Sequence, residues 1–175
     1  MLENIRAHSV VVSKVAHLIA RQLRDAGYDI SVELTTVASL LHDIGKTATL
    51  DSGEDHAEKG RLICLQNNLQ EIADIVGEHV QLKNHDINEA YSEKGIVFYS
   101  DKRVNHDRIV SLEERLAYLI DRYAKDQEPL ARAIQTNFEF CKRVEKKLFG
   151  KLYFRPELLA EMAKNEAIGP VKLPN

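Results

Sequence analysis

Apolar residues recur at helical spacing along almost the whole chain, and this periodicity is the feature that most limits the fold. In the first segment, Val12, Val15, Ile19 and Leu23 are three or four residues apart and form one stripe of a helix. Proline and glycine, which interrupt helices, occur only 4 and 8 times in 175 residues. The sequence therefore predicts an all-α helical bundle.

Capping signals divide this bundle into about seven to eight helices. Asp55 with Glu58, and Ser111 with Glu114, have the spacing of a capping box. Gly45 is expected as the residue that follows the end of the second helix. The expected helices cover residues 2–26, 32–44, 55–68, 69–80, a segment containing 97–104, and residues 111–125, 129–150 and 156–164.

Length and composition favour a single domain. A chain of 175 residues with 44% hydrophobic content can bury one ordinary core. We expect residues 1–125 to form the domain with the functional site, residues 126–165 to pack on it, and residues 166–175 to form a loose tail. Cys64 and Cys141 lie in helical patterns without a paired motif, which predicts buried free thiols.

The charge of the chain limits its partners. A formal charge of -3 and a pI near 6.2 give no basic field, which disfavours a dedicated nucleic-acid surface. No apolar run of about 18 residues predicts a membrane span, and residues 1–6 lack the order of a signal peptide. We therefore expect a cytoplasmic protein, whose substrate can be a compact anion if a metal holds it.

The most informative stretch is residues 37–46, where a nearly all-apolar helix ends in His42 and Asp43. A buried carboxylate is costly unless a cation satisfies it. An imidazole and a carboxylate are suitable ligands for a divalent metal, and adjacent residues can both lean toward an ion near the helix end. A hydrogen-bonded His–Asp pair in the core explains this stretch equally well.

His8 adds a second inward-facing histidine. It precedes Val12 by four residues and so continues the apolar stripe, whereas His17 falls on the opposite face and is predicted to lie at the surface. Taken alone, an inward histidine such as His8 is more often a core residue with a hydrogen-bond partner than a ligand.

Asp101 repeats the pattern, because it follows Val97 by four residues on a core-facing stripe. The alternative for Asp101 is a buried ion pair with Lys102 or Arg103. Residues one or two apart do not face each other on a helix, which favours a ligand role.

The remaining histidines divide into two pairs. His79 continues an apolar stripe at a helix end, and His56 lies in the first turn of the helix that Asp55 caps. His85 and His106 each lie between Asn and Asp in polar segments and are predicted to be exposed to solvent.

The order His8, His42-Asp43 and Asp101 resembles the H…HD…D signature of the HD-domain metal-dependent phosphohydrolases. The resemblance covers about residues 5–104, and residues 40–46 match the fuller HDIG-type motif. It implies a single HD-domain helical bundle in which these four residues bind a divalent metal.

A subgroup of this family, which includes bacterial hydrolases of diadenosine tetraphosphate, adds two histidines and holds two metals. By that resemblance, Asp43 would bridge to a second metal held with His56 and His79, and His85 is a competing candidate for the position of His79. Mixed His and carboxylate ligands suit Fe, Mn, Co, Ni or Zn.

A metal in such a site lowers the pKa of bound water and polarises a phosphoryl oxygen, so water is the expected nucleophile. Asp43 would orient that water, and an unligated oxygen of Asp101 would accept its proton. Lys46 would contact a substrate phosphate, or it would simply favour the helix dipole. Lys102 and Arg103 are further phosphate candidates, with solvated surface residues as the alternative.

The resemblance implies cleavage of a phosphoester or phosphoanhydride bond in a small nucleotide. Alternatives are a phosphodiesterase acting on a cyclic nucleotide or short oligonucleotide, and a non-catalytic, regulatory metal-binding module. The helix after Ser111 either lines the pocket or faces water; its candidate residues are Glu113, Glu114, Arg115 and Tyr118. The amphipathic stripe of residues 130–148 suits either a homodimer interface or packing within the chain.

Overall fold

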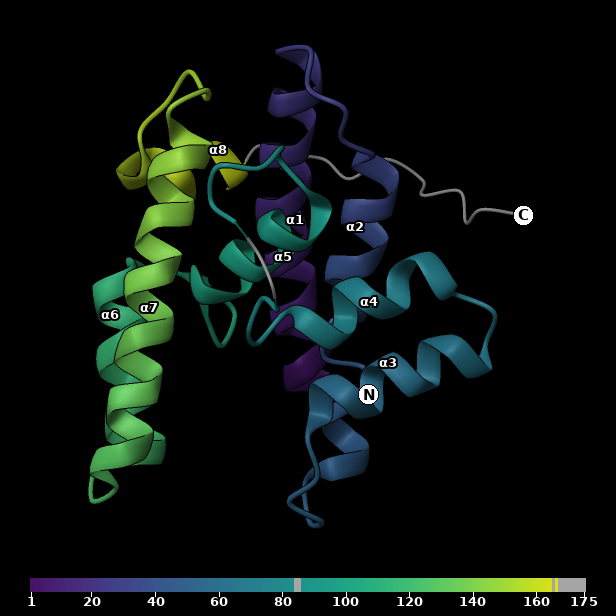
Figure 1. The fold of residues 1–175 in the computed structure, drawn as a ribbon, viewed down its shortest axis with the longest axis vertical. Helices are drawn as coiled ribbons and strands as arrows, with labels where there is room; N and C mark the ends of the chain where they lie inside the picture. The colour runs from purple at the N-terminus through teal and green to yellow at the C-terminus, as the bar shows by residue number, and fades with distance from the viewer. Residues whose placement is uncertain (84–85, 165, 167–175) are drawn as a thin grey trace.

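The computed structural model describes residues 1–83, 86–164 and 166, and its fold in that part is helical apart from one two-stranded ribbon (Figure 1). The all-α prediction is confirmed. The elements are α1 (Glu3–Asp25), α2 (Val32–Leu41), η1 (Lys46–Thr49), α3 (His56–Gln66), α4 (Gln70–Glu78), α5 (Glu93–Lys102), β1 (Val104–Asn105), β2 (Arg108–Ile109), α6 (Leu112–Leu119), η2 (Ile120–Ala124), α7 (Glu128–Phe149), η3 (Pro156–Leu158) and α8 (Leu159–Lys164).

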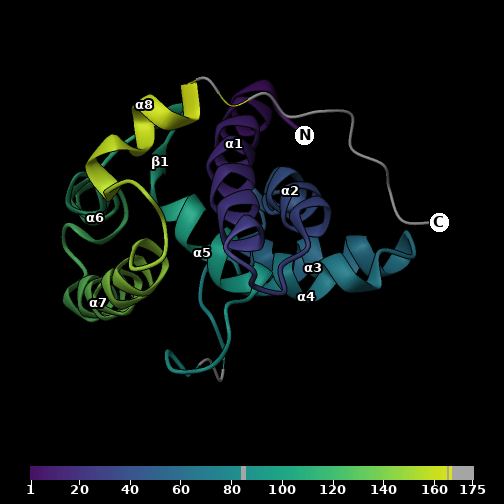
Figure 2. The same cartoon turned by 90° about the horizontal axis from the view of Figure 1, so that it is seen from above.

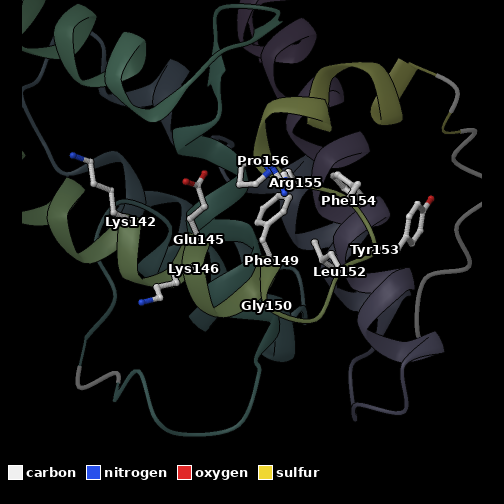
Figure 3. A pocket seen from close by; sticks show the side chains of 10 residues that line it. All are labelled: Lys142, Glu145, Lys146, Phe149, Gly150, Leu152, Tyr153, Phe154, Arg155 and Pro156. Atoms are coloured by element: carbon white, nitrogen blue, oxygen red, sulfur yellow. The ribbon is translucent and has the colours of Figure 1, made fainter.

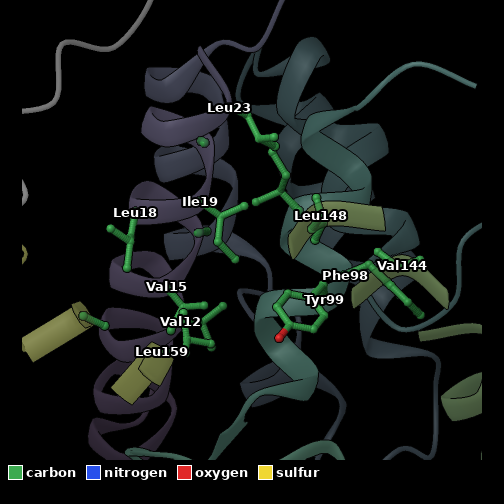
Figure 4. Close-up of a cluster of buried hydrophobic side chains, with 14 of the residues drawn as sticks. Val12, Val15, Leu18, Ile19, Leu23, Phe98, Tyr99, Val144, Leu148 and Leu159 are labelled. Atoms are coloured by element: carbon green, nitrogen blue, oxygen red, sulfur yellow. The ribbon is translucent and has the colours of Figure 1, made fainter. Parts of the chain in front are cut away.

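Helices α1 and α5 run through the middle of the molecule. Helices α2, α3 and α4 lie on one side of them, and α6, α7 and α8 lie on the other (Figures 1 and 2). The predicted stripe of α1 is fully buried, and Figure 4 shows Val12, Ile19 and Leu23 packed near Phe98 of α5 and Leu148 of α7. Each such side chain contributes roughly 1.5–3 kcal/mol by leaving water.

A second apolar cluster joins α2 to α3, α4 and α5. It contains Val37, Cys64, Ile72 and Val97. Both cysteines are buried and free, as predicted. The apolar stripe of α7 is buried within the chain at Phe138, Cys141, Val144 and Leu148, whereas Leu130 at its start is 39% exposed.

Side-chain caps begin four of the helices, as polar residues do where backbone N–H groups lack partners. Ser111 and Glu114 form the complete capping box that was predicted. Asp55 accepts hydrogen bonds from the backbone of Ala57 and Glu58, but Glu58 pairs with Arg61 and does not complete a box.

Two predicted helix ends are wrong. Helix α2 ends at Leu41, so His42 and Asp43 lie in the turn that follows it. Helix α5 ends at Lys102, and the chain then makes a short hairpin whose turn places His106 at a φ of 55°.

No helix in the described part of the chain is long and apolar enough to cross a membrane. The predicted tail, apart from Glu166, lies outside the described residues, and so does His85.

Candidate metal centre

Six side chains from separate parts of the sequence converge around Asp43. Helix α1 supplies His8, the turn after α2 supplies His42 and Asp43, and the first residue of α3 is His56. His79 follows α4, and Asp101 lies in the last turn of α5. These are the six metal ligands that the sequence and its resemblance indicated.

The two carboxylate oxygens of Asp43 face two different groups. Oδ2 lies 3.9 Å from Nε2 of His8 and 3.5 Å from Nε2 of His42. Oδ1 lies 3.4 Å from Nε2 of His56 and 3.5 Å from Nε2 of His79. A carboxylate in this position can bridge two metal ions.

Asp101 completes the first of these groups. Its Oδ1 lies 3.1 Å from Nε2 of His8 and 3.6 Å from Nε2 of His42. We call His8, His42, Asp101 and Oδ2 of Asp43 the first subsite. The second subsite consists of Oδ1 of Asp43 with His56 and His79, whose Nε2 atoms are 3.3 Å apart.

Backbone carbonyls fix three of the imidazole rings. Because a carbonyl oxygen only accepts hydrogen bonds, Nδ1 of each ring carries a proton, and the neutral form of each ring has its lone pair on Nε2, where a cation can bind it. The three rings are those of His8, His42 and His79, and the acceptors are the carbonyl oxygens of His106, Ser39 and Val76, at 2.8, 2.7 and 2.6 Å. The unpredicted hairpin therefore orients a ligand, since it carries His106.

The donor set fits a divalent cation. Nε2 of His42 and Oδ1 of Asp43 are buried and have no hydrogen-bond partner among the described residues. Leaving a buried polar atom unsatisfied costs about 1–3 kcal/mol, more where the group is charged. Two metal ions, one in each subsite, would each accept a lone pair from one of these atoms and remove that cost, and imidazole with carboxylate is their usual ligand chemistry.

The protonation states also suit metal binding. Burial opposes ionisation of Asp43 and Asp101, but neighbouring cations lower the pKa of each carboxyl well below its usual range; His42 has the largest effect on Asp43, and Lys102 on Asp101. Burial lowers the pKa of His56 to about 4 and lowers the pKa of His79. Both carboxylates are charged and these two histidines are neutral at pH 7, as metal ligands must be.

Gly45 brings the second subsite together. Its φ of -75° is ordinary, so the reason for glycine is close approach and not the helix-ending role that the sequence suggested. A Cβ at this position would lie 2.3 Å from the carbonyl oxygen of His56 and 2.5 Å from the backbone nitrogen of Gly60. The absence of a side chain lets α3 pack against the turn that holds Asp43.

A cleft of about 300 Å³ opens onto the first subsite. His8, Asp43 and Lys46 form its inner end, and Nζ of Lys46 donates a 2.9 Å hydrogen bond to Oδ2 of Asp43. The other lining residues are Leu2, Asn4, Ile5, Leu50, His106, Arg115, Tyr118, Arg122 and Tyr123.

The structure decides which residues of the helix after Ser111 face the site. Arg115 and Tyr118 line the cleft, but Glu113 and Glu114 do not. The sequence analysis did not identify Arg122 and Tyr123, because no motif marks them and their position depends on the π-helical turn η2. His106 is exposed, as predicted, and its ring lies 5.2 Å from that of Tyr118.

Lys102 and Arg103 do not contact the cleft, which corrects the expectation that they bind phosphate. Both are buried at 5% exposure. Nζ of Lys102 lies 4.4 Å from the centre of the Phe98 ring and donates to the carbonyl oxygen of His79 at 2.6 Å. Arg103 donates to Glu145 and to backbone carbonyls, so it ties α5 to α7.

The ion pair between Lys102 and Asp101, which the sequence disfavoured, does form, at 3.2 Å to Oδ2. The long lysine side chain curls back toward its neighbour at the end of α5. Oδ1 of Asp101 faces the histidines and Oδ2 pairs with Lys102. The role of Asp101 as acceptor of a proton from water stays a prediction.

His17 is not the surface residue that its position on α1 suggested. Helix α2 covers that face of α1, and Nδ1 of His17 lies 3.0 Å from Oγ1 of Thr36. Its side chain is 17% exposed.

Another hollow, of about 410 Å³, lies at the end of α7 (Figure 3). None of the six ligand candidates lines it, and its acid, Glu145, already binds Tyr99 and Arg103. We therefore place the candidate chemistry at the cleft and not at this hollow.

Comparison with known proteins agrees with this geometry. Residues 5–126 match the model of the HD domain, and the chain belongs to that family. The HD domain defines a superfamily of metal-dependent phosphohydrolases.

The individual relatives are distant or match only in part. An uncharacterized protein of Methanocaldococcus jannaschii is 25% identical over 150 residues, which cover 78% of this chain and 88% of that protein. A protein named ribonuclease Y from Sulfurovum sp. is 39% identical over 66 residues, 38% of this chain and 12% of its own length. Ribonuclease Y of Treponema denticola is 33% identical over 100 residues, 57% of this chain and 18% of its own length. No solved structure matches.

Proposed function

We propose that this protein is a metal-dependent hydrolase that cleaves a phosphoester or phosphoanhydride bond of a small nucleotide, with two divalent metal ions in its centre. The observation that carries the proposal is Asp43, whose two oxygens face two separate histidine groups beside an open cleft. Fe, Mn, Co, Ni and Zn all suit this ligand set.

Divalent metals held one in each subsite would lower the pKa of bound water and stabilise charge on a phosphoryl oxygen. Residues of the chain position the metal ligands and orient the substrate. Asp43 positions both ligand groups, and the three carbonyl-bound rings keep their Nε2 atoms directed inward. Lys46 stands at the inner end of the cleft, where its ammonium attracts and orients a phosphate.

The cleft distinguishes this proposal from a regulatory, non-catalytic module. Three members of the centre, His8, Asp43 and Lys46, line a space that a small molecule can enter. A purely structural metal site would have its ligands closed off from solvent.

A phosphodiesterase acting on a short oligonucleotide or cyclic nucleotide is the second candidate. The partial matches to two proteins named ribonuclease Y favour it. Those matches cover only 12% and 18% of the named proteins, so they bear on the domain and not on a whole enzyme.

The test is metal content and turnover of the same preparation. Elemental analysis measures the metal content of protein purified without chelator and of protein reconstituted with each of the five metals. It is then given nucleoside mono-, di- and triphosphates, a dinucleoside polyphosphate, a cyclic nucleotide and a short oligoribonucleotide. We expect about two metals per chain and hydrolysis of a nucleotide that chelation abolishes and metal restores.

Three outcomes would change this conclusion. Absence of metal after reconstitution overturns the metal centre itself. Bound metal without turnover of any substrate favours the regulatory module. Turnover confined to the cyclic nucleotide or the oligoribonucleotide favours the phosphodiesterase.

A further inference from the structure

The charges that line the cleft are unbalanced. Of the described residues that line it, Asp43 is the single acid, and Lys46 already lies against that carboxylate. The outer wall carries Arg115 from α6 and Arg122 from η2. Neither arginine forms an ion pair with any described residue. An anionic group bound at this wall would therefore face two arginines whose charge is not already paired with a described carboxylate.

One hydrogen bond holds the Arg115 side chain in place, and it uses few of the arginine's N–H donors. Its Nη1 donates a 2.9 Å hydrogen bond to Oδ1 of Asn105 on β1, which anchors the guanidinium to the hairpin. That bond uses one of the five N–H donors of an arginine. Its buried Nε has no hydrogen-bond acceptor in the part of the chain that the structure describes. A small rotation that gives Nε and Nη2 a shared acceptor would satisfy this donor, and phosphate matches that forked geometry.

Aromatic side chains accompany the two arginines. Tyr118 lies 5.7 Å from the Arg115 guanidinium, measured from the ring centre, and packs edge-on against His106. Tyr123, beside Arg122, is 53% exposed although it lines the cleft. An exposed tyrosine beside unpaired arginines suits a ligand that has a planar ring as well as negative charge.

We infer that the cleft selects nucleoside di- or polyphosphates over monophosphates, with the scissile phosphoryl at Lys46 and a second phosphate on Arg115. This inference rests on the proposed function and adds the substrate class. In the reaction, the oxygen of water bonds to phosphorus as the bridging P–O bond breaks. The leaving phosphate keeps the electron pair, and a proton passes to solvent.

The expected loss of kcat/KM follows from the hydrogen bonds between Arg115 and the second phosphate. A hydrogen bond to a charged partner contributes about 1.5–3 kcal/mol, which corresponds to roughly 10- to 150-fold in kcat/KM. The loss of kcat/KM should be confined to substrates with a second phosphate, because a monoester has no second phosphate to place on Arg115.

The experiment compares Arg115→Met and Arg115→Lys with the wild-type, metal-loaded protein on ADP, AMP and p-nitrophenyl phosphate. We expect wild type to prefer ADP to AMP by at least about tenfold in kcat/KM. Arg115→Met should lower kcat/KM for ADP by about 10- to 100-fold and leave p-nitrophenyl phosphate within about threefold. Arg115→Lys should fall between the two, because lysine keeps the charge but loses the fork.

Arg108→Met is the matched control, because this exposed arginine lies on β2, in the hairpin that Arg115 of α6 contacts, and does not line the cleft. If Arg115→Met fails to fold, Arg122→Met replaces it, since Arg122 is exposed and its change perturbs no core. That variant should also reduce ADP turnover selectively.

Equal rates on ADP and AMP, or equal losses on all three substrates, would overturn the inference and leave the hydrolase proposal intact. Metal-loaded protein that turns over none of these phosphates, nor any other on the wider panel, would overturn the proposed function itself.

Discussion

The two subsites around Asp43 differ in how rigidly their histidine ligands are held. In the first, the side chains of His8 and His42 are 8% and 0% exposed, and both rings are fixed by backbone carbonyls. In the second, His79 is equally buried and fixed, but His56 is 28% exposed and is the first residue of its helix. Histidine ligands that are buried and hydrogen-bonded to backbone carbonyls are pre-organised, whereas a more exposed histidine at the start of a helix is easier to displace.

Loss of the shared ligand should have the largest effect. We expect Asp43→Asn to reduce bound metal from about two ions per chain to near zero, because both subsites lose a charged oxygen. His56→Ala should instead retain about one ion, in the first subsite. Elemental analysis of dialysed protein measures this. Equal metal contents in the two variants would contradict the difference between the subsites.

Gly45→Ala should disrupt the second subsite while leaving the first. The new Cβ would lie 2.3 Å from a backbone oxygen of His56, so α3 must move away from Asp43. Overpacking of this kind costs typically about 1–3 kcal/mol in the free energy of unfolding. Urea denaturation and metal content measure the two effects.

Gly60→Ala is the control for that variant. Its Cβ would meet a methyl group of the buried Val76 at 2.8 Å and backbone only at 3.5 Å, whereas at Gly45 it would meet backbone at 2.3 and 2.5 Å. We expect a smaller loss of stability than for Gly45→Ala. The reverse order would show that close approach at Gly45 is not what holds the second subsite.

The pH dependence of stability should show the smallest effect. Burial lowers the pKa of His56 from 6.5 to about 4, so on acidification the unfolded chain binds a proton before the folded one does. The contribution of His56 to stability is therefore present above about pH 6.5 and is lost as the pH falls toward 4. The loss is on the order of 1–3 kcal/mol.

His56→Ala isolates this contribution. Burial lowers the pKa of His42, but Asp43, Asp101 and the Ser39 carbonyl together raise it further, and this acts in the opposite direction in both proteins. Metal-free wild type should lose more unfolding free energy than His56→Ala between pH 7 and 4.5. Thermal or urea unfolding measures it, and parallel curves would show that His56 titrates normally.

The candidate metal ligands could be predicted from sequence because each combined a local pattern with a motif. Helical spacing placed His8 and Asp101 on apolar faces, and the HDIG-type stretch marked His42 and Asp43. The roles of neighbouring cations could not be predicted in this way. Lys102 follows Asp101 directly, yet it is buried, and nothing in its sequence context distinguishes it from a surface lysine.

By itself, the sequence determined the all-helical class, most helix starts and the set of residues that could bind metal, since periodicity, capping and ligand chemistry are local properties. Only the tertiary structure decided that α2 covers His17, that Gly45 permits α3 to approach, and that Arg115 and Arg122 line the cleft. The physical reason is that periodicity shows which face of a helix is apolar, but not which other segment will cover it.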